Sequence, residues 1–216
     1  MKPLVLCSTS PRRKELFGWL GLPFSVRESQ FDESCIAPDP DDPEGYVATL
    51  ALGKVMSVFT GGMSQDGTYP DDALLIGSDT TVFQDGVFYG KPKSIDDARK
   101  TLQNLLGAQH SVYTAVAVLD TVTGEKNVEI VQTDVRFFPV GKEDLERYLA
   151  TGESMGKAGA YAIQEKASKF VQEVRGSFTN VIGFPLLAVR DMLENAGVII
   201  DVDVEQSILR KTGYQS

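Results

Sequence analysis

The segment from Ser8 to Lys14 has the residue types of an anion-binding site. It follows an apolar run that predicts a buried strand over Pro3–Cys7, and Pro11 is a favourable first helical residue with the preceding serine as N-cap. A helix N-terminus presents unpaired N–H groups and a partial positive charge, which suit a phosphate. The three cations Arg12–Lys14 are unfavourable there unless a polyanion compensates for them. The segment therefore predicts either a polyanion site or a run of solvated cations.

Asp79 follows an apolar run that predicts a second buried strand, in the sequence Gly-Ser-Asp-Thr. Its carboxylate could deprotonate water or hold a metal ion, although an Asp in this setting is more often a turn former. The dipeptide Asp85-Gly86 predicts a type I′ hairpin beyond it. In that register Thr80 pairs with Lys91, which brings a base next to Asp79. The alternative is a surface ion pair of little energetic value.

Lys54 continues the apolar spacing of Tyr46 and Leu50 on a helix expected to begin at Pro43. A lysine on such a helix can extend past the edge of the core and reach water. It can instead enter a cleft and meet phosphate. The spacing alone leaves both interpretations open.

The small-residue segment 152–164 is superficially similar to a phosphate-binding loop. Only three residues separate Gly152 from Gly156, and Ala158 stands where Ser or Thr would bind magnesium. We therefore reject a Walker A site and expect close packing of these small residues. Gln164 at the end of the segment can both donate and accept, so it is a candidate reader of a nucleobase edge.

Composition excludes several classes of site. A single histidine, His110, rules out the common catalytic zinc sets, and its place just after a helix end favours a capping or surface role over that of a triad base. Cys7 and Cys35 form neither a disulfide framework nor a C-x-x-C pair. The net charge of −9 argues against broad binding to nucleic acid or anionic membranes. No secretory or membrane-spanning stretch is visible, so a cytoplasmic location is expected.

Helices and strands are mixed along the 216 residues without strict βαβ alternation, which predicts a mixed α/β (α+β) fold. A single domain is expected over residues 1–203, followed by a loosely ordered tail over 204–216, and a mobile polar connection is expected up to Asp72. The pattern further predicts a hairpin formed by Phe170–Val174 and Phe178–Ile182, and a helix over Leu186–Asn195.

Taken together, the motifs resemble the Maf family of nucleoside triphosphate pyrophosphatases, also called septum formation inhibitors. The resemblance runs from Leu4 to about Leu193. It is carried, in order along the chain, by Ser8-Thr9-Ser10-Pro11-Arg12-Arg13, Asp32-Glu33, Gly77-Ser78-Asp79-Thr80, Gly90-Lys91-Pro92, Lys157-Ala158-Gly159-Ala160-Tyr161-Ala162-Ile163-Gln164 and Gly183-Phe184-Pro185-Leu186.

The resemblance implies a two-lobed Maf/ITPase-like fold with a central mixed sheet, a deep nucleotide cleft and hydrolysis to a monophosphate and pyrophosphate. It implies Asp79 as general base and a divalent cation, Mg²⁺ or Mn²⁺, with Glu33 and Asp79 as candidate ligands. It also implies a homodimer. The substrate-binding residues that it implies are Ser8, Arg12, Arg13, Glu33, Lys54, Thr80, Lys91 and Gln164.

Within this family, Arg12, Thr80 and Gln164 match the branch that hydrolyses dTTP and UTP. The branch that acts on 7-methyl-GTP typically has Trp, Gln and Glu at these places, so 7-methyl-GTP is the alternative substrate. A nucleotide-binding regulator of cell division with weak hydrolysis is the alternative from a different functional class.

The chain also departs from the family pattern at four positions. Ser154 and Gly156 replace a Pro and an Asp, and Glu165 replaces a common Gly near the base pocket. Gly53 stands before the helix lysine, at a position where the family often has Glu. Glycine in a helix interior costs roughly 1 kcal/mol relative to Ala. These departures bear on loop geometry, base preference and turnover.

Overall fold

The computed structural model describes residues 2–62 and 72–214, and the predicted connection before Asp72 lies almost entirely outside them. Seven strands form one mixed sheet in the order β2-β1-β3-β5-β6-β7, with β4 paired to β3. The strands are β1 (Leu4–Leu6), β2 (Phe24–Val26), β3 (Leu74–Gln84), β4 (Val87–Tyr89), β5 (Gln109–Asp120), β6 (Lys126–Phe137) and β7 (Val171–Arg175). Strand β1 runs parallel to β2 and β3, and the remaining pairs are antiparallel.

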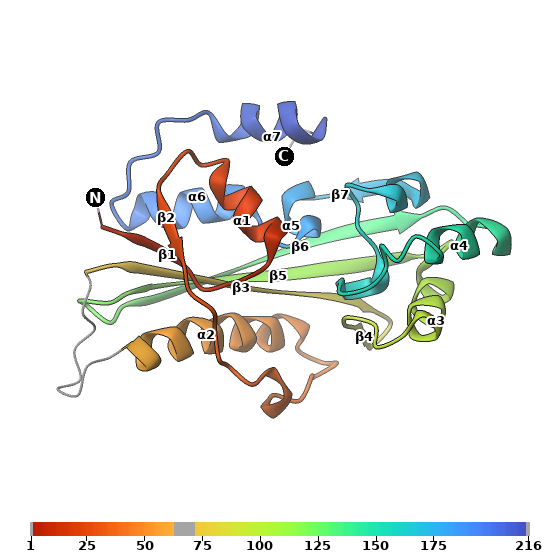
Figure 1. Cartoon of the computed structure of the whole chain (residues 1–216), viewed down its shortest axis with the longest axis horizontal. Coiled ribbons are helices and arrows are strands. Elements are labelled where there is room, and N and C mark those ends of the chain that lie inside the picture. The colour runs from red at the N-terminus through yellow and green to blue at the C-terminus, as the bar shows by residue number, and fades with distance from the viewer. Residues whose placement is uncertain (1, 63–71, 215–216) are drawn as a thin grey trace.

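Helices cover both faces of this sheet (Figure 1). The α-helices are α1 (Pro11–Gly18), α2 (Pro43–Gly62), α3 (Ile95–Leu105), α4 (Lys142–Leu149), α5 (Phe178–Ile182), α6 (Leu186–Asn195) and α7 (Val204–Thr212). Short 3₁₀ segments are η1 (Glu33–Cys35), η2 (Ala158–Ala160) and η3 (Lys166–Phe170). The predicted mixed α/β fold is therefore confirmed.

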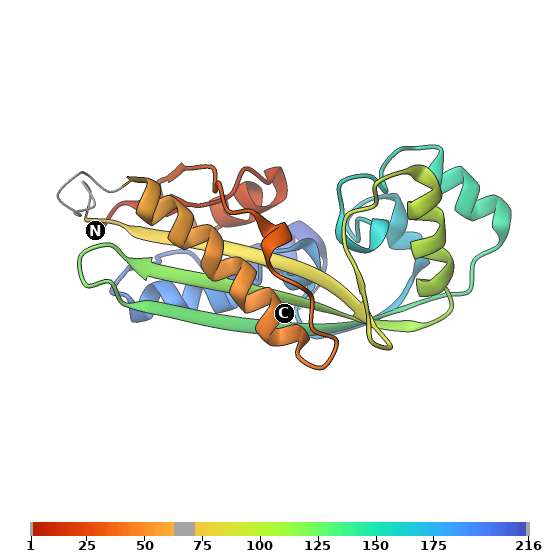
Figure 2. The same ribbon diagram turned by 90° about the horizontal axis from the view of Figure 1, so that it is seen from below.

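Two hydrophobic clusters correspond to the two faces. The apolar stripe of α2 packs against alternate residues of β1, β3 and β5, with Val47, Ala51 and Val55 fully buried. The larger cluster on the opposite face joins α1, α6 and α7 to the sheet and continues into α3 and α4. Figure 2 shows α3 and α4 gathered beyond one end of α2, as a smaller lobe at the end of the long strands.

The predicted Asp85-Gly86 turn is confirmed, since both residues have positive φ, 50° and 80°. However, β4 ends at Tyr89, so the expected ladder pair between Thr80 and Lys91 does not form. The other edge of β3 pairs with β5 from Leu74 to Phe83, and Pro92 has no N–H with which to extend β4.

Two other sequence expectations are wrong. Phe178–Ile182 is not a strand but helix α5, because the Ser177 side chain accepts from the backbone N–H of Asn180 and Gly183 ends the helix at φ 112°. Within the expected loose tail, residues Val204–Thr212 instead form α7, which is capped by Asp203 and buries Val204 and Ile208 in the core. The last two residues of the expected tail lie outside the described residues. Among the described residues, no helix is both long and apolar enough to cross a membrane.

Candidate active site

A close approach between α2 and β3 creates the centre of the site. Side chains alternate along β3, so Gly77 and Asp79 face the same side. A Cβ on Gly77 would lie 2.5 Å from Val55 Cγ2 and 3.0 Å from the backbone oxygen of Ala51. Only glycine therefore allows α2 to lie this close to β3 at residue 77, two residues before Asp79 on the same strand.

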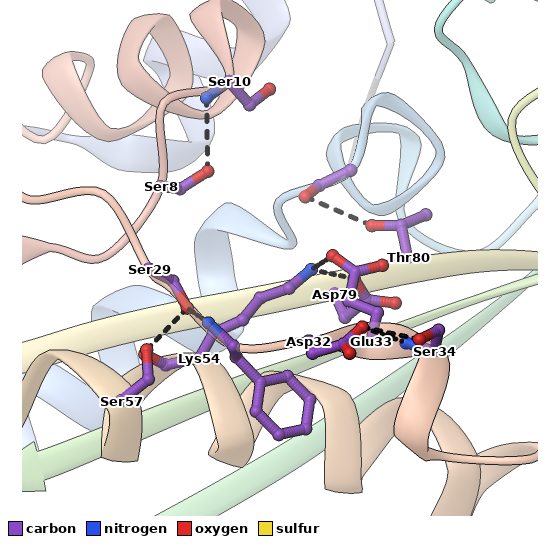
Figure 3. Close-up of polar contacts among 12 residues, drawn as sticks. Ser8, Ser10, Ser29, Asp32, Glu33, Ser34, Lys54, Ser57, Asp79 and Thr80 are labelled. Atoms are coloured by element: carbon purple, nitrogen blue, oxygen red, sulfur yellow. Dashed lines mark hydrogen bonds and ion pairs between the residues drawn. The ribbon is translucent and has the colours of Figure 1, made fainter.

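Lys54 projects from α2 into this space and is only 9% exposed. Its ammonium group contacts the Asp79 carboxylate and lies 2.9 Å from Glu33 Oε1 (Figure 3). Lys54 therefore does not extend past the core into water, and it links two acids that are far apart in the sequence.

Glu33 lies on η1 with half of its side chain exposed. Burial raises the pKa of Glu33, but the hydrogen bond and charge of Lys54 and the charges of Lys91 and Arg13 outweigh it. The net result is a pKa below the ordinary value for glutamate. Glu33 is therefore a carboxylate at neutral pH, adjacent to three cationic side chains.

Arg13 from α1 and Thr80 from β3 form a second hydrogen-bonded group in the site. The Arg13 Nε donates to the backbone oxygen of Gly183 at 2.9 Å, and its Nη2 donates to Thr80 Oγ1 at 3.2 Å. Thr80 Oγ1 also lies 2.9 Å from Thr114 Oγ1. Burial lowers the pKa of Arg13 while the charge of Asp79 raises it, and a guanidinium keeps its proton under these conditions.

These groups line one cleft of about 820 Å³ between the two lobes. The start of α1 contributes Ser8 and Arg12, and the backbone N–H of Ser10 donates to Ser8 Oγ at 3.3 Å. Ser10 occupies the N-cap position, as predicted, but its side chain makes no capping bond. Lys91 lines the cleft from its exposed rim, so the hairpin brings it to the site without the expected ladder pair.

Gln164, the predicted reader of the nucleobase edge, does not line the cleft. Gln164 is exposed and is not among the described residues that line the cleft, whereas its neighbour Glu165 is. Burial lowers the pKa of Arg12, and the nearby charge of Glu165 raises it. Of the other departures from the family pattern, Gly156 lines the cleft and Ser154 is fully buried.

Sequence reasoning did not single out Ser29 or Tyr46 as site residues, yet both line the cleft. For Tyr46 a signal existed, because Tyr46, Leu50 and Lys54 are spaced four residues apart on one helical face. For Ser29 no local pattern was available, since it lies in an irregular loop.

A divalent cation would find two carboxylates here, Glu33 and Asp79. In the described part of the chain no group of three or more His, Cys, Asp or Glu side chains could hold a metal. Magnesium is commonly bound through one or two carboxylates together with substrate phosphates and water. The donor set therefore fits a cation that arrives with a phosphorylated ligand.

Comparisons with known proteins identify the family of this chain. A family model described as Maf-like protein matches residues 3–196. A dTTP/UTP pyrophosphatase of Pelotomaculum thermopropionicum is 41% identical over 197 residues, which cover 91% of this chain and 98% of the relative. Those of Clostridium botulinum and Moorella thermoacetica are each 41% identical over 198 residues, covering 92% of this chain and 99% and 97% of the relatives. The chain therefore belongs to the Maf family.

Proposed function

We propose that this chain is a nucleoside triphosphate pyrophosphatase that hydrolyses dTTP and UTP, and modified pyrimidine relatives, to the monophosphate and pyrophosphate. The observation that carries this proposal is the buried contact of Lys54 with Asp79 and Glu33 in a cleft that also contains Arg13 and Lys91. The names and high coverage of the relatives support the substrate class.

In the proposed reaction Asp79 is the general base. It takes a proton from the water whose oxygen attacks the α-phosphorus, and the bond between that phosphorus and the bridging oxygen to the β-phosphorus breaks. The electron pair leaves with pyrophosphate. Arg13, Lys54 and Lys91 neutralise the triphosphate and the charge that develops on the leaving group, while Ser8 and the N–H groups at the start of α1 donate hydrogen bonds.

Glu33 and Asp79 would hold a divalent cation, Mg²⁺ or Mn²⁺, which supplies further neutralisation of the triphosphate when bound. Both carboxylates contact Lys54. Triphosphate oxygens offer this ammonium an alternative partner, so we infer that Lys54 turns toward the phosphates when substrate binds.

The base preference belongs to the same proposal. An amide such as Gln164 can match the carbonyl and N–H edge of uracil or thymine. The position of Glu165 in the cleft favours a base with N–H donors, which keeps 7-methyl-GTP as the alternative substrate. A homodimer is also proposed, on the family resemblance, and a cytoplasmic location stays a prediction from the sequence pattern.

The test is pyrophosphate release from dTTP, UTP, CTP, GTP and 7-methyl-GTP with Mg²⁺ or Mn²⁺. Asp79→Asn should lower kcat by about 10²–10⁴-fold, the usual contribution of a general base. Asp85→Asn is the matched control, since it removes the same charge at an exposed turn whose φ of 50° suits Asn. Release that does not depend on Asp79 would refute its role as base. No release from any nucleotide would instead support the binding-regulator alternative.

A further inference from the structure

Gly53 makes an unusually close contact with an aromatic ring. A Cβ at this position would lie 2.5 Å from Phe31 Cζ and 2.7 Å from both Phe31 Cε atoms. Real Cβ atoms do not approach ring atoms this closely, so the ring rests directly on the backbone of α2. The glycine that departs from the family pattern is therefore the residue that makes room for Phe31.

Two serines fasten the same loop to the same helix. Ser57 lies one turn after Gly53, and its Oγ is 2.8 Å from Ser29 Oγ (Figure 3). Ser57 Oγ also accepts from the backbone N–H of Gln30 at 3.2 Å, and Ser29 Oγ accepts from that of Phe31 at 3.2 Å. Residues 29–31 are thus held to α2 by two hydrogen bonds to Ser57 and one ring contact, and the bond from Phe31 to Ser29 braces the loop internally.

This attachment ends two residues before Glu33. The Glu33 side chain is half exposed, so its own burial does little to hold it beside Lys54. At the start of η1 the carboxylate of Asp32 accepts from the backbone N–H of Ser34 at 3.0 Å, which sets the local turn. Apart from the ion pair between Glu33 and Lys54 itself, the contacts between this loop and α2 described above run through Phe31 and the two serines.

We propose that Phe31 and Gly53 are a positioning pair that holds Glu33 against Lys54. The proposal deepens the proposed function, since it rests on Glu33 taking part in binding the metal–nucleotide complex. On this proposal, glycine is required at position 53 because a side chain there would displace the Phe31 ring. The displaced ring would move the loop, and Glu33 with it, away from the site.

The competing explanation is that Gly53 is a tolerated imperfection of the helix. The two explanations predict opposite results for Gly53→Ala. A tolerated glycine, when replaced by Ala, gives a more stable protein of unchanged activity. If Gly53 positions the loop, its replacement by Ala lowers activity without destabilising helix α2.

The experiment compares Gly53→Ala with Gly61→Ala, a matched control in the same helix where an added Cβ meets no described atom within 4 Å. We expect Gly53→Ala to lower kcat/KM with the metal–nucleotide complex by about tenfold to a hundredfold, as small misplacements of reacting groups do, and Gly61→Ala to leave it unchanged. Amide hydrogen exchange of residues 29–36 should be faster in Gly53→Ala only, whether or not the enzyme is active.

Two further variants separate positioning from general damage. Phe31→Ala removes the ring, so adding Gly53→Ala to it should cause no additional loss of activity. In a Glu33→Gln background Gly53→Ala should likewise add nothing, because the residue it positions is already changed. If Gly53→Ala fails to fold, the Phe31→Ala variant carries the test through its own kcat/KM and exchange rates.

Unchanged activity and unchanged exchange in Gly53→Ala would overturn the proposal, as would losses that simply multiply in the double variants. These outcomes are distinct from failure of the proposed function. In that case the wild-type chain releases no pyrophosphate, and the exchange comparison still reports whether Phe31 and Gly53 hold the loop.

Discussion

Acidification should destabilise this protein through its single histidine. His110 is 2% exposed, its Nε2 lies 2.9 Å from the hydroxyl of Tyr161, and its Nδ1 has no hydrogen-bond partner among the described residues. Burial lowers the pKa of His110 to about 4, although the charge of Asp134 acts in the opposite direction. The imidazole is therefore neutral in the folded protein at every pH above that value.

The sign and size of the effect follow from linkage. Between pH 6.5 and about 4 the unfolded chain binds a proton at His110 and the folded chain does not, so the free energy of unfolding falls as the pH falls through this window. At about 1.4 kcal/mol per pH unit, the full loss is about 3 kcal/mol, and it is absent above pH 6.5. This is a large fraction of the 5–15 kcal/mol typical of a folded domain.

Urea unfolding at pH 7.5, 6.5, 5.5, 4.5 and 4 measures this loss, with the fluorescence of Trp19, the only tryptophan, as the signal. His110→Gln is the control, because its amide can still bond to Tyr161 but does not titrate. Carboxylates titrate in both proteins, so the wild type should lose about 3 kcal/mol more than the variant on going to pH 4. Equal losses in the two proteins, or an imidazole NMR resonance that titrates near 6.5, would refute the reasoning.

Three other changes test the site and the fold. Arg13→Lys keeps the charge but loses the two-pronged contact, so kcat/KM for dTTP should fall about tenfold or more with little change in Tm. Ile208→Ala should lower the free energy of unfolding by about 2–5 kcal/mol, whereas Leu209→Ala, 38% exposed, should cost far less; equal costs would show that α7 is not part of the core. Glu165→Gln should change the ratio of activity on dTTP and 7-methyl-GTP more than Gln164→Glu does, and the reverse order in the pyrophosphate assay would assign base reading to Gln164.

Local patterns predicted the parts of the fold that short-range physics controls. The Asp-Gly turn after β3 has the positive φ angles that this dipeptide favours, and the helix over Leu186–Asn195 has the bounds that its apolar spacing predicts. The strand-to-helix junction at Pro11 was also predicted, because proline fixes the φ angle that a first helical residue needs. Each of these signals is complete within a few neighbouring residues.

The errors arose where capping residues outweighed composition. Phe178–Ile182 contains residues that favour strands, but Ser177 and Gly183 set the two ends of a helical turn. The C-terminal helix α7 is polar over most of its length, and burial of Val204 and Ile208 against the core stabilises it. The α5 error was local, since both capping residues adjoin the segment. Helix α7 could not be read from periodicity, because the core that it packs against is formed by residues elsewhere in the chain.

The sequence also determined one part of the candidate site, and the tertiary structure decided the rest. The sequence by itself determined the identity of its groups: a carboxylate after a buried apolar run, a cationic helix start and a lysine on an apolar helix. The structure places that carboxylate, Asp79, in the middle of β3 and not at a strand end. Only the tertiary structure decided that Lys54 joins Asp79 to Glu33, that Arg13 reaches the carbonyl of Gly183, and that Glu165 rather than Gln164 lines the cleft. The physical reason is that residue types define what chemistry is available, whereas the distances between groups far apart in sequence depend on how helices pack against the sheet.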